Sequence, residues 1–217
     1  MELINLGQEN SILNSFVAQM RDSKIQKDSL RFRTNLNRLG QIFAYEISKT
    51  LSFSPKGVRT PLGTAEVNTY DDKVVLATIL RAGLPLHEGI LSFFDNAENA
   101  FFAAYRKYDE ADKFHINTEY CTCPELEGKI LIIADTMLAT GSSILLAYER
   151  LIHDGGQPKH VHFVCPIASV DAVENLKKKL PRNTTLWTAA IDEELTRHSY
   201  IVPGLGDAGD LAYGDKI

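Results

Sequence analysis

Short apolar runs separated by helix-like segments fill the chain after residue 73. The runs are Val74–Leu80, Ala100–Tyr105, Lys129–Ala134, His160–Cys165 and Thr185–Ala190. Continuous apolar strands with helices between them are typical of a parallel sheet covered on both faces. The pattern therefore predicts a Rossmann-like α/β fold, in which ligands bind beyond the carboxyl ends of the strands.

The first third of the chain has a different pattern. Apolar residues recur there at three- and four-residue spacing, which predicts one buried face of a helix; they are Leu36, Leu39, Phe43 and Ile47. The segment from Ser52 to Tyr70 contains proline and glycine between short β-prone pieces, which predicts a β-hairpin arm. Because a projecting arm often serves oligomerisation, we expect a homodimer or a larger homo-oligomer.

Composition narrows the class of protein. With 217 residues, 44% of them hydrophobic, the chain is long enough for one domain with a substantial core. Its net charge of -5 makes nucleic acid an unexpected partner. No stretch has the pattern of a membrane span or a signal peptide, and three unevenly spaced cysteines do not form a disulfide framework. These features predict a cytoplasmic protein.

The segment after the third run has the composition of a phosphate-binding turn. Asp135 is followed by small and hydroxyl residues up to Ser143, where a helical stretch begins. Backbone N–H groups of such a turn and the helix N-terminus attract an anion, and the hydroxyls of Thr140, Ser142 and Ser143 add donors. The lysine of a P-loop and the three glycines of a dinucleotide motif are absent, so we expect a monophosphate.

Asp135 needs a different partner, because a carboxylate in contact with a phosphate would repel it. Two vicinal sugar hydroxyls suit a carboxylate, which accepts two hydrogen bonds side by side. Together these groups predict a ribose 5-phosphate site. The alternative is an ordinary strand-to-helix turn in which Asp135 and Thr136 cap the helix.

The same segment resembles the phosphoribosyl pyrophosphate (PRPP) motif of the type I phosphoribosyltransferases. A single acid, preceded by Ala134, resembles the uracil phosphoribosyltransferases of that family. Three further blocks agree: Ile79–Leu84, Tyr105–Arg106 and Tyr200–Asp210, of which the last is similar to a signature of the uracil enzymes. The resemblance extends over nearly the whole chain, from about residue 10.

The resemblance implies that the chain joins uracil to PRPP, with UMP and pyrophosphate as products, in pyrimidine salvage. The implied catalytic residues are Arg81, Arg106, Asp135 and Asp207. The implied PRPP-binding residues are these four together with Thr136, Met137, Leu138, Ala139, Thr140, Gly141, Ser142 and Ser143. The implied uracil-binding residues are Ile201, Gly206, Asp207 and Ala208.

The resemblance also divides the single domain, residues 1–217, into functional parts. These are N-terminal helices at about 10–51, the arm at about 52–70, a PRPP-binding core at about 71–190 and a uracil-binding hood at about 191–217. Mg²⁺ is expected to arrive on PRPP, with no metal ligand from protein side chains. GTP, which activates some members of the family, stays open as an effector. A PRPP- or nucleotide-binding regulator without turnover is the alternative function.

Two positions depart from the family pattern. Thr136 stands where proline is usual and Ser142 where glycine is usual. If position 142 needs a positive φ, serine there costs about 1–2 kcal/mol.

Three polar groups outside these motifs have simpler interpretations. Cys121 and Cys123 lack the further ligands of a zinc site, and His160 and His162 fit polar alternation on a strand surface. The acidic run from Asp192 to Glu194 fits a solvated cluster that could start a helix.

Overall fold

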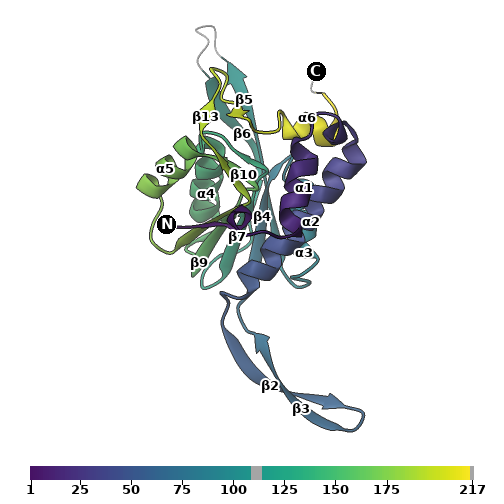
Figure 1. Ribbon diagram of the computed structural model, residues 1–217. Helices are drawn as coiled ribbons and strands as arrows, with labels where there is room; N and C mark the ends of the chain where they lie inside the picture. The colour runs from purple at the N-terminus through teal and green to yellow at the C-terminus, as the bar shows by residue number, and fades with distance from the viewer. Residues whose placement is uncertain (109–113, 216–217) are drawn as a thin grey trace.

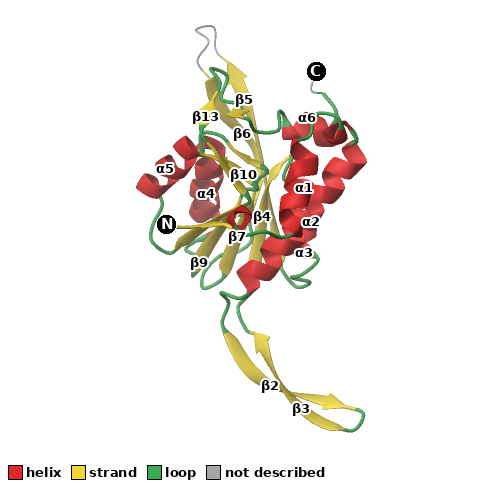
Figure 2. Cartoon of the chain, in the orientation of Figure 1, coloured by secondary structure: helices red, strands yellow, loops and turns green. Residues whose placement is uncertain are grey.

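A central sheet organises the protein. The computed structural model describes residues 1–108 and 114–215, without the side chains of 104–108 and 114–119. Across this part, a seven-stranded sheet has the order β1-β11-β9-β7-β4-β5-β6. Figure 2 shows the strands in yellow between the helices. Its strands are β1 (Glu2–Asn5), β11 (Thr184–Thr188), β9 (His160–Val164), β7 (Ile130–Ala134), β4 (Val74–Leu80), β5 (Glu98–Tyr108) and β6 (Phe114–Thr122).

The predicted apolar runs all lie in this sheet. Neighbouring strands are parallel except β5 and β6, which pair antiparallel. The two outermost strands, β1 and β6, were not predicted. Both are edge strands, so one of their sides has no ladder partner and their sequences lack the continuous apolar character of buried strands. The prediction of a parallel sheet flanked by helices is nevertheless confirmed.

Helices cover both faces of the sheet (Figure 1). One face carries α1 (Ile12–Arg21), α2 (Ser29–Ser48) and α3 (Leu84–Leu91), and the other carries α4 (Ser142–Gly155) and α5 (Val170–Lys179). Short 3₁₀ turns, η1 (Leu6–Gln8) and η2 (Ile25–Lys27), flank α1. Each layer encloses its own hydrophobic cluster, so the sheet is buried on both sides.

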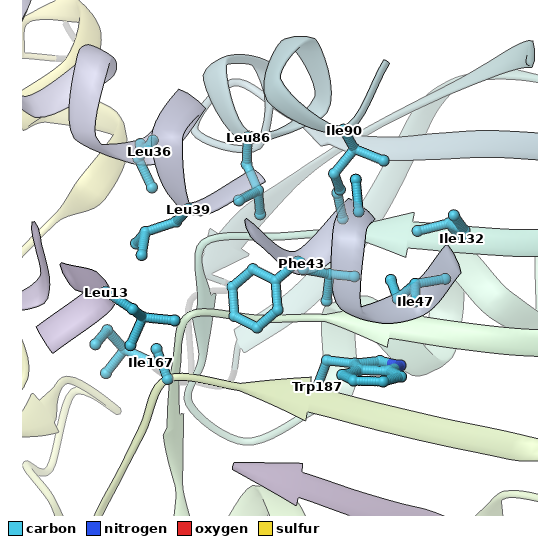
Figure 3. Packing of buried hydrophobic residues seen from close by; sticks show 14 of the residues in the cluster. Leu13, Leu36, Leu39, Phe43, Ile47, Leu86, Ile90, Ile132, Ile167 and Trp187 are labelled. Atoms are coloured by element: carbon cyan, nitrogen blue, oxygen red, sulfur yellow. The ribbon is translucent and has the colours of Figure 1, made fainter. Parts of the chain in front are cut away.

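The predicted helical stripe faces the sheet. Leu36, Leu39, Phe43 and Ile47 are fully buried in α2. Figure 3 shows Phe43 and Ile47 above Trp187 of β11, in the cluster on this side of the sheet. The stripe is therefore core, as its spacing indicates.

The arm projects from the body as a two-stranded antiparallel hairpin (Figure 1). It consists of β2 (Phe53–Thr60) and β3 (Gly63–Tyr70), whose side chains are almost all exposed. At its base the Lys159 ammonium lies 2.5 Å from a carboxylate oxygen of Asp72 and 3.0 Å from the Ser52 hydroxyl. The predicted hairpin is confirmed.

A second layer of short strands lies beyond the carboxyl ends of the main sheet. A three-stranded parallel sheet is formed by β8 (Met137–Leu138), β10 (Ile167–Ser169) and β12 (Ala190–Asp192). The chain then forms an antiparallel pair, β13 (Glu194–Leu195) and β14 (Ile201–Val202), and ends in α6 (Ala208–Tyr213). In the described ranges, no helix is both long and apolar enough to span a membrane.

Two sequence-based interpretations are wrong. His162 is 2% exposed and accepts a hydrogen bond from Trp187 Nε1, so it belongs to the interior and not to a strand surface. Asp192 is also buried, pairs with Arg21 and ends a strand where a solvated helix start was expected. In both cases a partner distant in sequence satisfies the polar group, which allows its burial.

Candidate active site

The candidate site lies where the order of the sheet reverses. From β4 the chain passes to β5 on one side, and it returns to form β7 on the other side of β4. In open α/β sheets, ligands bind at this switch point, beyond the carboxyl ends of the strands. Arg81 follows β4 and Asp135 follows β7, so these two neighbouring strands bring the predicted residues to one edge.

The turn from β7 to α4 borders a small hollow that is open to solvent. Its lining residues are Asp135, Met137, Leu138, Ala139, Thr140, Gly141, Ser142, Ser143 and Ile144. The N-terminus of α4 borders this hollow, so its first N–H groups supply a partial positive charge. The turn thus has the polarity expected for a phosphate site.

Gly141 supplies the unusual backbone of this turn. Its φ is 77°, and α4 starts at the next residue, Ser142, whose φ is not positive. The strain considered for serine at position 142 is therefore absent. The Thr140 hydroxyl donates to the Ser142 hydroxyl at 3.0 Å and accepts from the Ser142 N–H at 3.3 Å.

Two residues of the neighbouring β10–α5 segment support the turn from behind. The Ser169 hydroxyl donates to the Ala139 carbonyl at 2.5 Å, and the Asn175 amide donates to the Thr140 carbonyl at 2.9 Å. These bonds fix two carbonyl groups of the turn on the α5 side. The sequence did not predict either residue. The local pattern at Ser169 indicates only the N-cap of α5, a role that Ser169 also fills.

Two residues of the predicted PRPP set have buried side chains. Thr136 is 2% exposed and does not line the hollow, and Leu138 is 1% exposed and packs in the cluster beneath α4 and α5. The Thr136 carbonyl accepts from the Ile167 N–H of β10. The structure thus gives both residues a packing role within the turn.

Arg81 reaches the C-terminal helix. Its guanidinium donates to a carboxylate oxygen of Asp210 at 3.0 Å and to the Gly214 carbonyl at 3.3 Å. A side chain on the neighbouring Gly83 would clash with the backbone, since its Cβ would come within 2.6 Å of the Ile79 carbonyl. Arg81 therefore leaves a tightly packed turn and joins the β4 edge to α6, a contact that the sequence did not predict.

Arg106 lies in β5, where its backbone pairs with Ile116 of β6. Its side chain is outside the described part of the structure.

Asp207 begins α6. One of its carboxylate oxygens accepts from the N–H groups of Gly209 at 2.8 Å and Asp210 at 3.0 Å. Ile201 and Ala208, from the predicted uracil set, are buried, whereas Gly206 takes a φ of 94° with open space around it. Gly206 thereby turns the chain between Ile201 and α6, and the predicted hood residues lie within one short segment.

The thiol beside Asp135 is not activated as a nucleophile. The Cys165 thiol follows β9, and burial, together with the nearby Asp135 carboxylate, raises its pKa well above the ordinary value. Such a thiol stays protonated and unreactive. The described residues include no cluster of three or more histidine, cysteine or acidic side chains that would hold a metal.

The fold and this turn define the class, an α/β protein with a polar turn at the switch point of a parallel sheet. The model of the uracil phosphoribosyltransferase family matches residues 8–215, and the chain belongs to this family. The family and the enzyme class that the sequence motifs implied are thereby confirmed.

Individual relatives agree. The chain is 57% identical over 217 residues to the uracil phosphoribosyltransferase of Porphyromonas gingivalis, covering 100% of both chains. It is 41% identical over 189 residues to that of Methanothermobacter thermautotrophicus, covering 86% of this chain and 85% of the relative. The solved structure of the AQ2163 protein from Aquifex aeolicus is similar at a TM-score of 0.85, with 32% identity and 98% of each chain covered.

Proposed function

We propose that this chain transfers the phosphoribosyl group of PRPP to uracil and releases UMP and pyrophosphate. The observation that carries the proposal is the anion-binding turn after β7, beside Arg81, in a chain of the uracil phosphoribosyltransferase family. In this proposal the hollow between Asp135 and Ser143 takes the 5-phosphate. The Asp135 carboxylate accepts the two ribose hydroxyls.

The pyrophosphate end of PRPP is assigned to Arg81 and Arg106. Guanidinium groups bind phosphate oxygens in a fork and offset the charge that the leaving group gains. Uracil N1 forms a bond to ribose C1 as the bond from C1 to the pyrophosphate oxygen breaks. Because no covalent nucleophile is needed, catalysis consists of aligning the reactants and stabilising the leaving group.

Uracil is assigned to the hood. One edge of the ring presents an acceptor, a donor and an acceptor, which backbone groups at Ile201 and from Gly206 to Ala208 match. Cytosine would place an amino group against a donor, leaving buried polar groups unpaired. The N1 proton passes to Asp207 or to water. Asp207 also lies beside the open hollow that Lys27 and Ser29 border, next to α6.

Mg²⁺ is proposed to enter with PRPP. The described residues form no cluster of metal ligands, and Asp135 is the one acidic side chain that lines the hollow, so oxygen atoms of PRPP and water would hold the ion. It would offset the charge on the pyrophosphate oxygens. GTP activation, a homo-oligomeric state and a cytoplasmic location remain predictions.

A turnover assay tests the proposal. Purified protein is mixed with PRPP, Mg²⁺ and labelled uracil, with cytosine, hypoxanthine and orotate in parallel, each with and without GTP. We expect UMP from uracil alone, and a rate increase with GTP if it is an activator. PRPP binding without product from any base would instead support the regulator, which the names of the relatives do not favour.

A further inference from the structure

A partly buried ion pair connects the first helix to the start of the hood. Arg21, the last residue of α1, donates from both terminal nitrogens to the two carboxylate oxygens of Asp192, each at 2.9 Å. The Asp192 side chain is 8% exposed and that of Arg21 is 22% exposed. Neither residue belongs to the motifs that the sequence assigned to PRPP or uracil.

The pair holds both polar backbone groups of a single hood residue. The Gly204 N–H donates to Asp192 at 3.0 Å, and the Gly204 carbonyl accepts from Arg21 at 3.2 Å. Gly204 has a φ of 53°, and a Cβ there would come within 2.1 Å of the Ile201 carbonyl. The turn from Ile201 to Gly206 is therefore closed over the ion pair and fixed by it.

A second contact from the same side supports this turn. The Gln26 amide nitrogen, in the orientation that suits its surroundings, donates to the carbonyls of Met20 and Leu205 at 2.9 Å each. Ile201 and Leu205 are each 4% exposed. The segment at the end of α1 thus fixes the backbone at Gly204 and Leu205.

We infer that Arg21 and Asp192 are positioning residues that set the affinity for the pyrimidine base. The inference rests on the proposed function, because it takes the backbone at Ile201 and Gly206–Ala208 as the surface that reads uracil. A buried ion pair is often no more stabilising than well-packed apolar side chains. Here the pair satisfies the N–H and the carbonyl of Gly204 together, which two apolar residues cannot do. The hydrogen bonds of the pair therefore hold the backbone of the turn in place.

The pair does not line the hollow between Asp135 and Ile144. Loosening it should disturb base binding and leave PRPP binding nearly unchanged. This separation distinguishes a positioning role from general destabilisation, which would weaken the binding of both the base and PRPP.

The test is steady-state kinetics of Arg21→Lys. Lysine keeps the charge but replaces the planar fork with a single ammonium, so it cannot hold both Asp192 oxygens and the Gly204 carbonyl in one plane. We expect the KM for uracil to rise roughly tenfold, equivalent to about 1.4 kcal/mol, while the KM for PRPP stays within about twofold. Arg150→Lys is the matched control, since Arg150 pairs with Asp154 on the exposed surface of α4.

Asp192→Asn and the double variant complete the cycle. If the two residues act as one unit, the double variant should raise the uracil KM no further than the more damaging single change. The inference is overturned if Arg21→Lys leaves the KM for uracil unchanged. It is also overturned if the KM values for uracil and PRPP rise together while the melting temperature falls. Wild-type protein that makes no UMP would instead count against the proposed function. If Asp192→Asn fails to fold, the KM values of Arg21→Lys for uracil and PRPP still test the inference.

Discussion

Single residues determine the shape of the turn between β7 and α4. Gly141 takes the left-handed conformation, and the next residue starts α4 with ordinary helical backbone. The carbonyls of Ala139 and Thr140 are tied to Ser169 and Asn175. The serine that departs from the family pattern at position 142 is therefore compatible with the turn.

Replacing Gly141 and Ser142 separately tests this division of roles. Gly141→Ala should lower the free energy of unfolding by about 1–2 kcal/mol, because alanine disfavours a positive φ. Ser142→Ala should change it by less than about 0.5 kcal/mol, since only one partly exposed hydroxyl is lost. Urea unfolding of both variants measures the difference. Equal losses would contradict the assignment of the strained position to Gly141.

Arg81 is the residue whose geometry should matter most for PRPP. In Arg81→Lys the charge remains but the fork that now reaches Asp210 and Gly214 is lost. We expect the KM for PRPP to rise roughly 10- to 100-fold, because a point charge does not bind phosphate oxygens in pairs. Arg182→Lys, an exposed arginine at the opposite ends of the strands, is the control. If Arg81→Lys leaves the KM for PRPP unchanged, Arg81 does not bind the pyrophosphate.

At the scale of elements, β9 and β11 are joined through side chains as well as through their ladder. Trp187 Nε1 donates to His162 Nδ1 at 3.0 Å, and the Thr185 hydroxyl lies 3.0 Å from His160 Nε2. Burial, with the neighbouring His160 adding to it, lowers the pKa of His162 to about 3. The native state therefore requires the neutral imidazole.

This requirement predicts a pH dependence of stability. An unfolded histidine binds a proton below about pH 6.5, whereas native His162 stays neutral until its pKa of about 3. The unfolded state thus binds more protons in this window, and His162 should lower the free energy of unfolding by up to about 1.4 kcal/mol per pH unit as the pH falls.

His162→Gln removes this titration and can still accept from Trp187. Urea unfolding between pH 7 and pH 4 should give a shallower loss for this variant than for wild type, whereas the exposed His198→Gln should match wild type. If the free energy of unfolding depends on pH in the same way for wild type and His162→Gln, then His162 titrates alike in the folded and unfolded states.

At the scale of the whole molecule, the arm projects from the body and contacts it near its base. A two-stranded hairpin alone is marginal in water, and this one exposes several large apolar side chains. They are Phe53, Val58, Leu62, Val67 and Tyr70. A second copy of the chain would cover them, in keeping with the predicted homo-oligomer.

Polar replacement of the arm tests that prediction. The triple variant Val58→Ser, Leu62→Ser, Val67→Ser should sediment as a smaller species than wild type, because it removes apolar surface available for association. Val170→Ser changes an apolar residue on α5 that is about as exposed as Val58, and it should leave the sedimentation coefficient unchanged. If the triple variant also sediments like wild type, the arm does not mediate assembly.

Local sequence determined the strands of the sheet interior, the α2 stripe, the hairpin and the turn at Asp135–Ser143. Each depends on a short pattern: continuous apolar runs, three- and four-residue spacing, or an acid followed by small residues before a helix. Contacts between distant segments were decided only by the tertiary structure. Arg21 meets Asp192 across 171 positions and Arg81 meets Asp210 across 129. Their partners depend on how helices and strands pack, and no local propensity records that packing, so burial of Asp192 and His162 could not be read from their neighbours in sequence.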